Sequence, residues 1–157
     1  MNIIYYCFAG AHASVVAAAI HCGLLPSGRI PEPEEFSALR YYDKTPPDNI
    51  GQPYFMGDDE AGNHVYFMGM RNQRENITAV IKSMLLLSGW QEDEYILQDA
   101  FPLINFSTKF GGLLSKRWYV TNLGRSLTIW GMRRQYPMFV TMVAQVKAKS
   151  GFQQEKE

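Results

Sequence analysis

The residue types and spacing best suited to chemistry lie in a segment of small and polar residues, CFAGAHAS over 7–14. It follows the apolar run NIIYYC (2–7), which predicts a buried strand, and it opens the alanine-rich run 13–22, which predicts a helix. Free backbone N–H groups and the positive end of the helix dipole meet at such a place, where proteins bind phosphate. We therefore expect a phosphate site in this segment, with Gly10 allowing close approach to the backbone. Its lining residues are Cys7, Gly10, His12 and Ser14.

The segment resembles two known phosphate-binding motifs and completes neither. In the P-loop motif G-x-x-x-x-G-K-[ST], Ser14 takes the last place, but Ala13 replaces the lysine. The loop of low-molecular-weight tyrosine phosphatases has a cysteine, five residues, an arginine and a serine or threonine. Cys7 and Ser14 fit that frame, but Ala13 again replaces the cation that stabilises the transition state. Four interpretations stay open: a P-loop NTPase, a cysteine phosphatase, anion binding with a cation supplied from elsewhere, and a tight turn without a ligand.

Two pairs of arginines follow predicted strands and precede predicted helices. Arg71 and Arg74 follow the third strand, and Arg133 and Arg134 follow the fifth. A guanidinium binds two phosphate oxygens at once, whereas an arginine at a helix start opposes the dipole. These arginines are therefore candidates for neutralising a phosphate, and the alternative is ordinary pairing with acidic side chains such as Glu75.

Two residues are candidates for proton transfer. His12 lies inside the loop, and histidine side chains titrate near neutral pH, which suits a general acid or base. The alternatives for His12 are a helix cap and a surface residue. Asp99 ends the apolar run over 95–98, where a carboxylate can hold magnesium or act as a base. The alternative for Asp99 is the N-cap of a helix that begins near Pro102.

The chain has 157 residues, of which 15 are Lys or Arg and 15 are Asp or Glu. A net charge of zero excludes a protein that attracts nucleic acid over its whole surface. The charge is unevenly distributed, because residues 1–100 hold 6 basic and 13 acidic side chains and residues 101–157 hold 9 and 2. This asymmetry indicates either two halves that neutralise each other in one fold or a basic face that meets a partner.

A second functional hypothesis uses the basic face. The region 109–136 combines basic and aromatic residues and has no RNA-recognition motif, so nucleic-acid binding is not favoured. The hypothesis is a non-catalytic interaction protein, acting in sporulation, with a protein or nucleic-acid partner. The residues in question include Lys109, Lys116, Arg117, Trp118, Tyr119 and Arg125.

Cysteine usage and hydropathy indicate a cytoplasmic protein. Cys7 and Cys22 fall at the ends of different predicted elements, too far apart for a disulfide, so we expect reduced thiols. No C-x-x-C pair is present, so we expect no metal site, and no cofactor is specified. No apolar run reaches about 18 residues, so we expect no transmembrane segment. The N-terminus has no basic region and predicts a core strand rather than a signal peptide.

Strand and helix patterns alternate along the chain. The fold class we expect is α/β: a three-layer Rossmann-like or P-loop-like sheet of about five strands with one β-hairpin and helices on both faces. It forms one domain over 1–150, with a flexible tail over 151–157. The expected strands are 2–7, 54–56, 64–68, 95–98 and 127–130, and the expected helices are 13–22, 33–42, 73–88, 103–116 and one that begins at Pro137. Ligands bind beyond the carboxyl ends of such strands, which here means 7–14, 69–74, 99–101 and 131–134.

Four stretches together resemble a small bacterial family known as domain of unknown function 3189, associated with spore-forming Firmicutes. They are the opening NIIYYCFAGAHASVVAAAIHCGLLP, then HVYFMGM, FGGLLSKRW and LGRSLTIWGMRR. The resemblance spans residues 1–149, and the C-x-x-G-x-H-x-S opening is its most specific part. The family more often has serine or threonine at the place of Ala13, so this chain lacks one hydroxyl group of the loop. The resemblance implies no activity and no catalytic residues.

The functional prediction is a phosphate or nucleotide ligand at the loop over 7–14. If the protein is an enzyme, the expected reaction is phosphoryl transfer or hydrolysis, with His12 or Asp99 as acid or base. The sequence specifies neither the substrate nor the oligomeric state.

Overall fold

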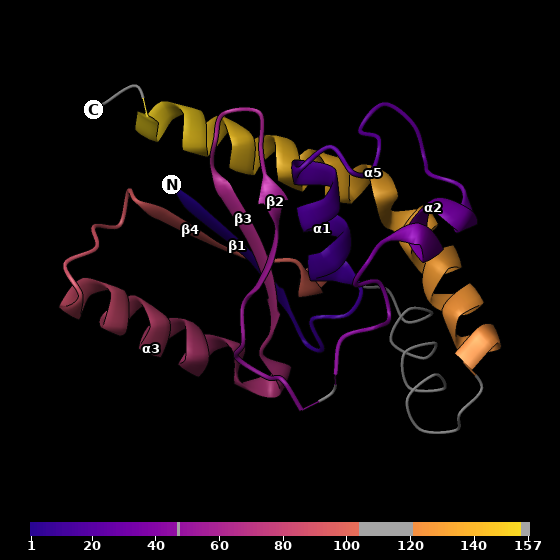
Figure 1. Ribbon diagram of the computed structural model, residues 1–157, viewed down its shortest axis with the longest axis horizontal. Coiled ribbons are helices and arrows are strands. Elements are labelled where there is room, and N and C mark those ends of the chain that lie inside the picture. The colour runs from indigo at the N-terminus through magenta and orange to yellow at the C-terminus, as the bar shows by residue number, and fades with distance from the viewer. Residues whose placement is uncertain (47, 104–120, 155–157) are drawn as a thin grey trace.

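The computed structural model describes residues 1–46, 48–103 and 121–154. Strands and helices alternate along the chain (Figure 1). The strands are β1 (Asn2–Cys7), β2 (Tyr54–Asp58), β3 (His64–Gly69) and β4 (Tyr95–Asp99). The helices are α1 (Ala13–His21), α2 (Pro33–Ala38), α3 (Arg74–Leu87) and α5 (Thr121–Gln154), with the 3-10 turns η1 (Arg71–Gln73) and η2 (Phe101–Leu103).

The four strands of the described residues form one open sheet in the order β2-β3-β1-β4. β1 is parallel to both of its neighbours, and β2 pairs with β3 as an antiparallel hairpin. The apolar run of β1 thus becomes a central strand, as expected for a strand covered on both faces. This confirms an α/β fold with a hairpin.

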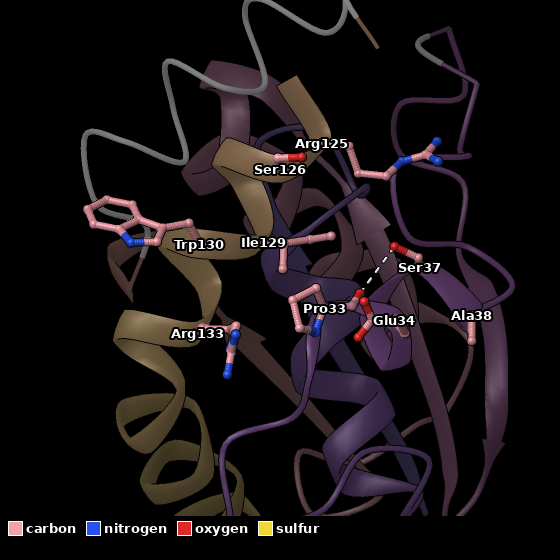
Figure 2. Close-up of a pocket in the computed structure, with 9 residues that line it drawn as sticks. All are labelled: Pro33, Glu34, Ser37, Ala38, Arg125, Ser126, Ile129, Trp130 and Arg133. Carbon is pink, nitrogen blue, oxygen red and sulfur yellow. Dashed lines mark hydrogen bonds between the residues drawn. The ribbon is translucent and has the colours of Figure 1, made fainter. Parts of the chain in front are cut away.

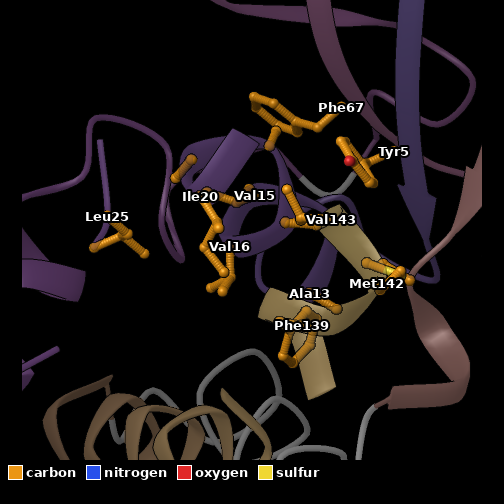
Figure 3. Close-up of a cluster of buried hydrophobic side chains, with 14 of the residues drawn as sticks. Tyr5, Ala13, Val15, Val16, Ile20, Leu25, Phe67, Phe139, Met142 and Val143 are labelled. Carbon is orange, nitrogen blue, oxygen red and sulfur yellow. The ribbon is translucent and has the colours of Figure 1, made fainter. Parts of the chain in front are cut away.

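The main core lies between the sheet, α1 and α5. Ile3, Tyr5 and Cys7 alternate along β1 and are buried on this face. All nine residues of α1 are buried, because the sheet covers one side of the helix and α5 covers another. Figure 3 shows the side chains of α1 packed beside Phe139 and Val143 of α5.

The other face of the sheet carries α3, which lies on the side opposite α1 and α5 (Figure 1). Helices therefore flank both faces, as predicted. α3 covers its face loosely, since none of its 14 residues is buried.

The fifth predicted strand is wrong, because residues 127–130 lie inside α5, a helix of 34 residues. The β-branched and aromatic residues of LTIW favour a strand locally, but tertiary packing overrides this preference. The buried residues of α5 recur at steps of three and four, which is the period of a helix with one covered face. They include Ile129, Met132, Tyr136, Phe139, Met142, Val143 and Val146.

Two further boundaries differ from the prediction, and a third lies outside the described residues. Pro137 lies within α5 and does not begin a helix, so residues 131–134 are helical and do not follow a strand. α2 ends at Ala38 rather than near residue 42, because the next residue, Leu39, has an extended ψ of 134°. Of the helix predicted over 103–116, the residues after Leu103 lie outside the described part of the chain.

Candidate functional site

The loop between β1 and α1 lies where the connections of the sheet change sides. The β1–β3 connection contains α1, and the β3–β4 connection crosses the opposite face through α3. In open α/β sheets, ligands bind at the carboxyl ends of the strands beside such a switch point. The structure therefore brings three of the four predicted segments, those after β1, β3 and β4, to one edge of the sheet.

Cys7 is the centre of a small hydrogen-bonded group inside this loop. The Gly10 N–H donates to Cys7 Sγ at 3.2 Å, and Ser14 Oγ lies 3.2 Å from the same sulfur. Cys7 is 2% exposed and Ser14 is fully buried. The loop thus folds around the sulfur atom, and the Ser14 hydroxyl bonds within the protein.

Gly10 is required by the packing of the loop. Its φ is +63°, and a Cβ atom there would lie 2.6 Å from the backbone nitrogen of Gly69. The Met70 N–H also donates to the Cys7 carbonyl at 2.9 Å, so the loops after β1 and β3 are held together. The glycine accommodates the neighbouring loop, which explains its presence without a ligand.

His12 belongs to a cluster of polar side chains around Asp43. Its Nε2 lies 3.2 Å from Asp43 Oδ1, and the two side chains are 8% and 5% exposed. Arg125 Nε of α5 lies 3.6 Å from the other Asp43 oxygen. The Arg125 Nε is itself sealed from solvent and makes no hydrogen bond. The cluster connects the loop to α5 through one carboxylate.

The turn after α2 covers the loop. The Asp43 N–H donates to the Ala11 carbonyl at 2.9 Å, and Thr45 Oγ1 donates to the Gly10 carbonyl at 3.0 Å. Asp43 has a φ of 57°, which fits a tight turn. No local sequence pattern brings Asp43, Thr45 or Arg125 to the loop, so Asp43 and Thr45 were not predicted and Arg125 was expected only in the basic region.

The start of α1 has no side-chain cap. His12 is the N-cap residue but makes no capping bond, and the first turn of α1 contains no acidic residue. The first N–H groups of a helix have no partner within the helix, so this end can accept an anion. Phe8, at 39% exposed, marks the accessible part of the loop.

Arg74 and Asp99 meet at the same edge of the sheet. Arg74 Nε donates to Asp99 Oδ2 at 3.2 Å, and its guanidinium lies 4.0 Å from the centre of the Phe101 ring. The Phe101 N–H donates to Asp99 Oδ1 at 2.8 Å, so this carboxylate caps the turn η2. The Arg71 N–H donates to the Phe8 carbonyl at 2.8 Å, which places Arg71 beside the loop.

Arg133 and Arg134 lie elsewhere on α5. Arg133 forms an ion pair with Glu32 at 3.1 Å, and Arg134 lies 5.7 Å from the Trp130 ring centre. Figure 2 shows Arg133 beside a groove of about 700 Å³ between α2 and α5. Of the basic region, Lys109, Lys116, Arg117, Trp118 and Tyr119 lie outside the described residues.

A second buried polar group lies outside the loop. Tyr5 Oη lies 2.7 Å from His21 Nδ1, and His21 Nε2 lies 3.0 Å from Asp59 Oδ2. Burial lowers the pKa of His21, and hydrogen bonds from Asn63 hold the pKa of Asp59 low despite its burial. An ionised Asp59 can only accept hydrogen bonds, so neutral His21 donates one to it from Nε2. The Nδ1 atom of His21 then accepts a hydrogen bond from the Tyr5 hydroxyl.

Comparisons with known proteins give a family and no activity. No helix among the described residues is long and apolar enough to cross a membrane. Searches of curated proteins and of solved structures found no match. The family described as "protein of unknown function (DUF3189)" matches residues 2–148. The chain therefore belongs to the DUF3189 family.

Proposed function

We propose that the loop between β1 and α1 binds a phosphate-containing ligand or nucleotide. The observation that carries this proposal is the uncapped start of α1, directly after the central strand and at the switch point of the sheet. An anion there accepts hydrogen bonds from backbone N–H groups at the positive end of the dipole. With it we propose a Rossmann-like or P-loop-like sheet, and free Cys7 and Cys22 support a cytoplasmic location.

The proposed cations are Arg71 and Arg74. Both lie in the segment after β3. The backbone N–H of Arg71 bonds to the Phe8 carbonyl of the loop, and Arg74 lies at the neighbouring end of β4 through its contact with Asp99. The Arg74 side chain is 25% exposed, so it reaches solvent. These guanidinium groups supply the positive charge that Ala13 lacks.

The experiment is a thermal-shift measurement with inorganic phosphate and with nucleoside mono-, di- and triphosphates, each with and without magnesium. A ligand at one hundred times its Kd stabilises the fold by about 2.7 kcal/mol. In a domain of this size that raises the melting temperature by about 5–10 °C.

Two matched variants locate the binding. Phe8→Glu adds a carboxylate at the exposed part of the loop, and Leu24→Glu adds the same charge at a residue that is 55% exposed beyond the other end of α1. We expect the shift to disappear in Phe8→Glu and to persist in Leu24→Glu. A flat wild-type panel, or equal shifts in both variants, would contradict the proposal. Gly10→Glu is unsuitable, because its side chain would collide with Gly69.

A second candidate function, phosphoryl transfer through Cys7, is favoured by the hydrogen bonds that its sulfur makes with the Gly10 N–H and the Ser14 hydroxyl. The Cys7 thiolate would attack phosphorus, and the bond from phosphorus to the leaving oxygen would break. The leaving oxygen would take a proton from His12, since both oxygens of Asp99 accept hydrogen bonds from Arg74 and Phe101. Water would then hydrolyse the phosphorus–sulfur bond and return the thiolate.

The test is hydrolysis of 4-nitrophenyl phosphate by the full chain, with Cys7→Ser compared with Cys22→Ser. Cys22 lies in the same chain and is only partly buried, so it controls for loss of a thiol. We expect Cys7→Ser to abolish turnover and Cys22→Ser to retain it. Binding without turnover would remove this second function and leave the phosphate site in place.

A further inference from the structure

The orientation of the His12 ring is fixed by two neighbours. Its Nε2 lies 3.2 Å from Asp43 Oδ1, and the ring meets the fully buried Tyr42 ring edge-on, with 5.3 Å between the ring centres. The His12 side chain is only 8% exposed. The imidazole therefore has one defined orientation, and each of its two nitrogens has its own surroundings.

The contact with Asp43 determines which nitrogen carries the proton. Arg125 Nε lies 3.6 Å from the second Asp43 oxygen, so a cation accompanies this group as a carboxylate. A carboxylate only accepts hydrogen bonds, and the 3.2 Å contact therefore requires a proton on His12 Nε2. When His12 is neutral, Nδ1 is then the nitrogen without a proton, and its lone pair can accept a hydrogen bond.

The Nδ1 atom of His12 is accessible and has no hydrogen-bond partner among the described residues. In that part of the chain, the side chain of His12 forms a hydrogen bond with Asp43 alone. Within the same residues, the one unpartnered side-chain nitrogen or oxygen that is sealed from solvent is Arg125 Nε. It follows that His12 Nδ1 reaches solvent. A largely buried side chain thus presents a single hydrogen-bond acceptor at the N-cap position of α1.

The backbone beside this acceptor supplies hydrogen-bond donors. The first hydrogen bond of α1 joins the Val16 N–H to the His12 carbonyl at 2.8 Å, so the N–H groups of residues 13–15 precede the helical ladder. An anion at the start of α1 meets these donors and the Nδ1 acceptor together. The donors suit any oxyanion, whereas the acceptor suits only an oxyanion that keeps a hydrogen on one of its oxygens.

We propose that His12 makes the site selective for oxyanions that carry a proton, such as hydrogen phosphate, over proton-free ones such as sulfate. This inference rests on the proposed phosphate site and adds its selectivity. The P–O–H group donates to His12 Nδ1, while other phosphate oxygens accept from the start of α1. Sulfate has the same shape and, at pH 8, the same charge, but it places an oxygen lone pair against Nδ1. Proton donation by His12 in phosphoryl transfer needs the doubly protonated ring, whereas selectivity uses the neutral one.

The first test locates the proton on His12 and needs no ligand. The chain contains three histidines, so nitrogen-15 NMR of the imidazole rings gives a simple spectrum that His21→Gln and His64→Gln assign. At pH 8 we expect His12 to carry its proton on Nε2 and none on Nδ1. A proton on His12 Nδ1 overturns the proposal, because the acceptor is then absent.

The second test titrates the full chain with potassium phosphate or potassium sulfate at pH 8 and equal ionic strength, and follows the backbone amide signals of residues 13–15. In the wild type we expect phosphate to bind about tenfold more tightly than sulfate, the effect of one hydrogen bond to a charged group. His12→Phe keeps a planar ring beside Tyr42 but has no acceptor, so it should bind both ions equally. The control His64→Phe, at an exposed position of β3, should keep the preference.

The outcomes separate the selectivity from the site itself. Equal binding of the two ions by the wild type, or a preference that persists in His12→Phe, overturns the role of His12 and leaves the phosphate site in place. If neither ion shifts the amide signals, the phosphate site fails and its selectivity with it. Circular dichroism checks that each variant is folded, and both wild-type measurements keep the proposal falsifiable if His12→Phe is not.

Discussion

Gly10 offers the sharpest test of how the loop is held, because two other glycines, Gly69 and Gly23, each carry one of the two constraints that act on it. Gly10 combines a φ of +63° with a Cβ position 2.6 Å from the Gly69 nitrogen. Gly69 has only the contact, since its Cβ would lie 2.7 Å from the Ala9 carbonyl carbon. Gly23 has only the backbone angle, with a φ of +70° and no atom within 4 Å of its Cβ position.

The magnitudes follow from these geometries. An L-residue in the left-handed region destabilises the fold by about 1–2 kcal/mol, which is the effect expected for Gly23→Ala. Overpacking destabilises by about 1–3 kcal/mol, which is the effect expected for Gly69→Ala, because a backbone contact cannot rotate away. Gly10→Ala should combine both effects, at about 2–5 kcal/mol. In a chain of this size, that loss lowers the melting temperature by about 4–20 °C.

The assay is urea unfolding of the three variants, followed by circular dichroism. We expect the free energy lost in Gly10→Ala to be close to the sum of the other two losses. If Gly10→Ala is no more destabilising than Gly23→Ala, the close approach to Gly69 is absent. The explanation of Gly10 by packing against Gly69, without a bound ligand, would then fail as well.

Three further predictions concern buried polar groups. Burial lowers the pKa of His21, so the unfolded chain binds more protons than the folded one as the pH falls, and stability present above about pH 6.5 is lost below it. The urea midpoint should therefore decrease as the pH is lowered from 7.5 to 5, and it should decrease less in His21→Gln. Tyr136→Phe removes the 2.7 Å bond to the Pro26 carbonyl and should reduce the unfolding free energy by about 1 kcal/mol in the same assay. Burial and the nearby Asp59 raise the pKa of Cys22 to about 12, so its alkylation by iodoacetamide at pH 8 should be slow until urea unfolds the chain.

The sequence predicted the elements whose pattern is local. The apolar run of β1, the polar tip between β2 and β3, and the alternation of strand and helix all appear in the structure. The position of the loop over 7–14 was also predictable, because a loop after a central parallel strand must lie at the carboxyl edge of the sheet. Whether this loop binds phosphate stays a prediction.

The partners within the site were not predictable. His12 meets Asp43 across 31 positions, and Arg125 of α5 meets the same carboxylate. Neither contact with Asp43 is encoded by a local sequence pattern, because each depends on how the turn after α2 and the helix α5 pack against the loop. The expected position of Arg133 and Arg134 after a strand was wrong for a related reason, because residues 127–130 are helical.

α1 contains the constraint that would have corrected this error. In its sequence, ASVVAAAIH, apolar residues occur on every side of the helix, and all nine residues are buried. A sheet covers only one side of a helix, so the other side needs a second long cover. The predicted strand at 127–130 with a helix from Pro137 would provide this cover only from Pro137 onward. A continuous helix with apolar residues at steps of three and four does, and α5 packs along α1 in this way. The burial required by one helix thus decides the structure of another, where local preference favours a strand.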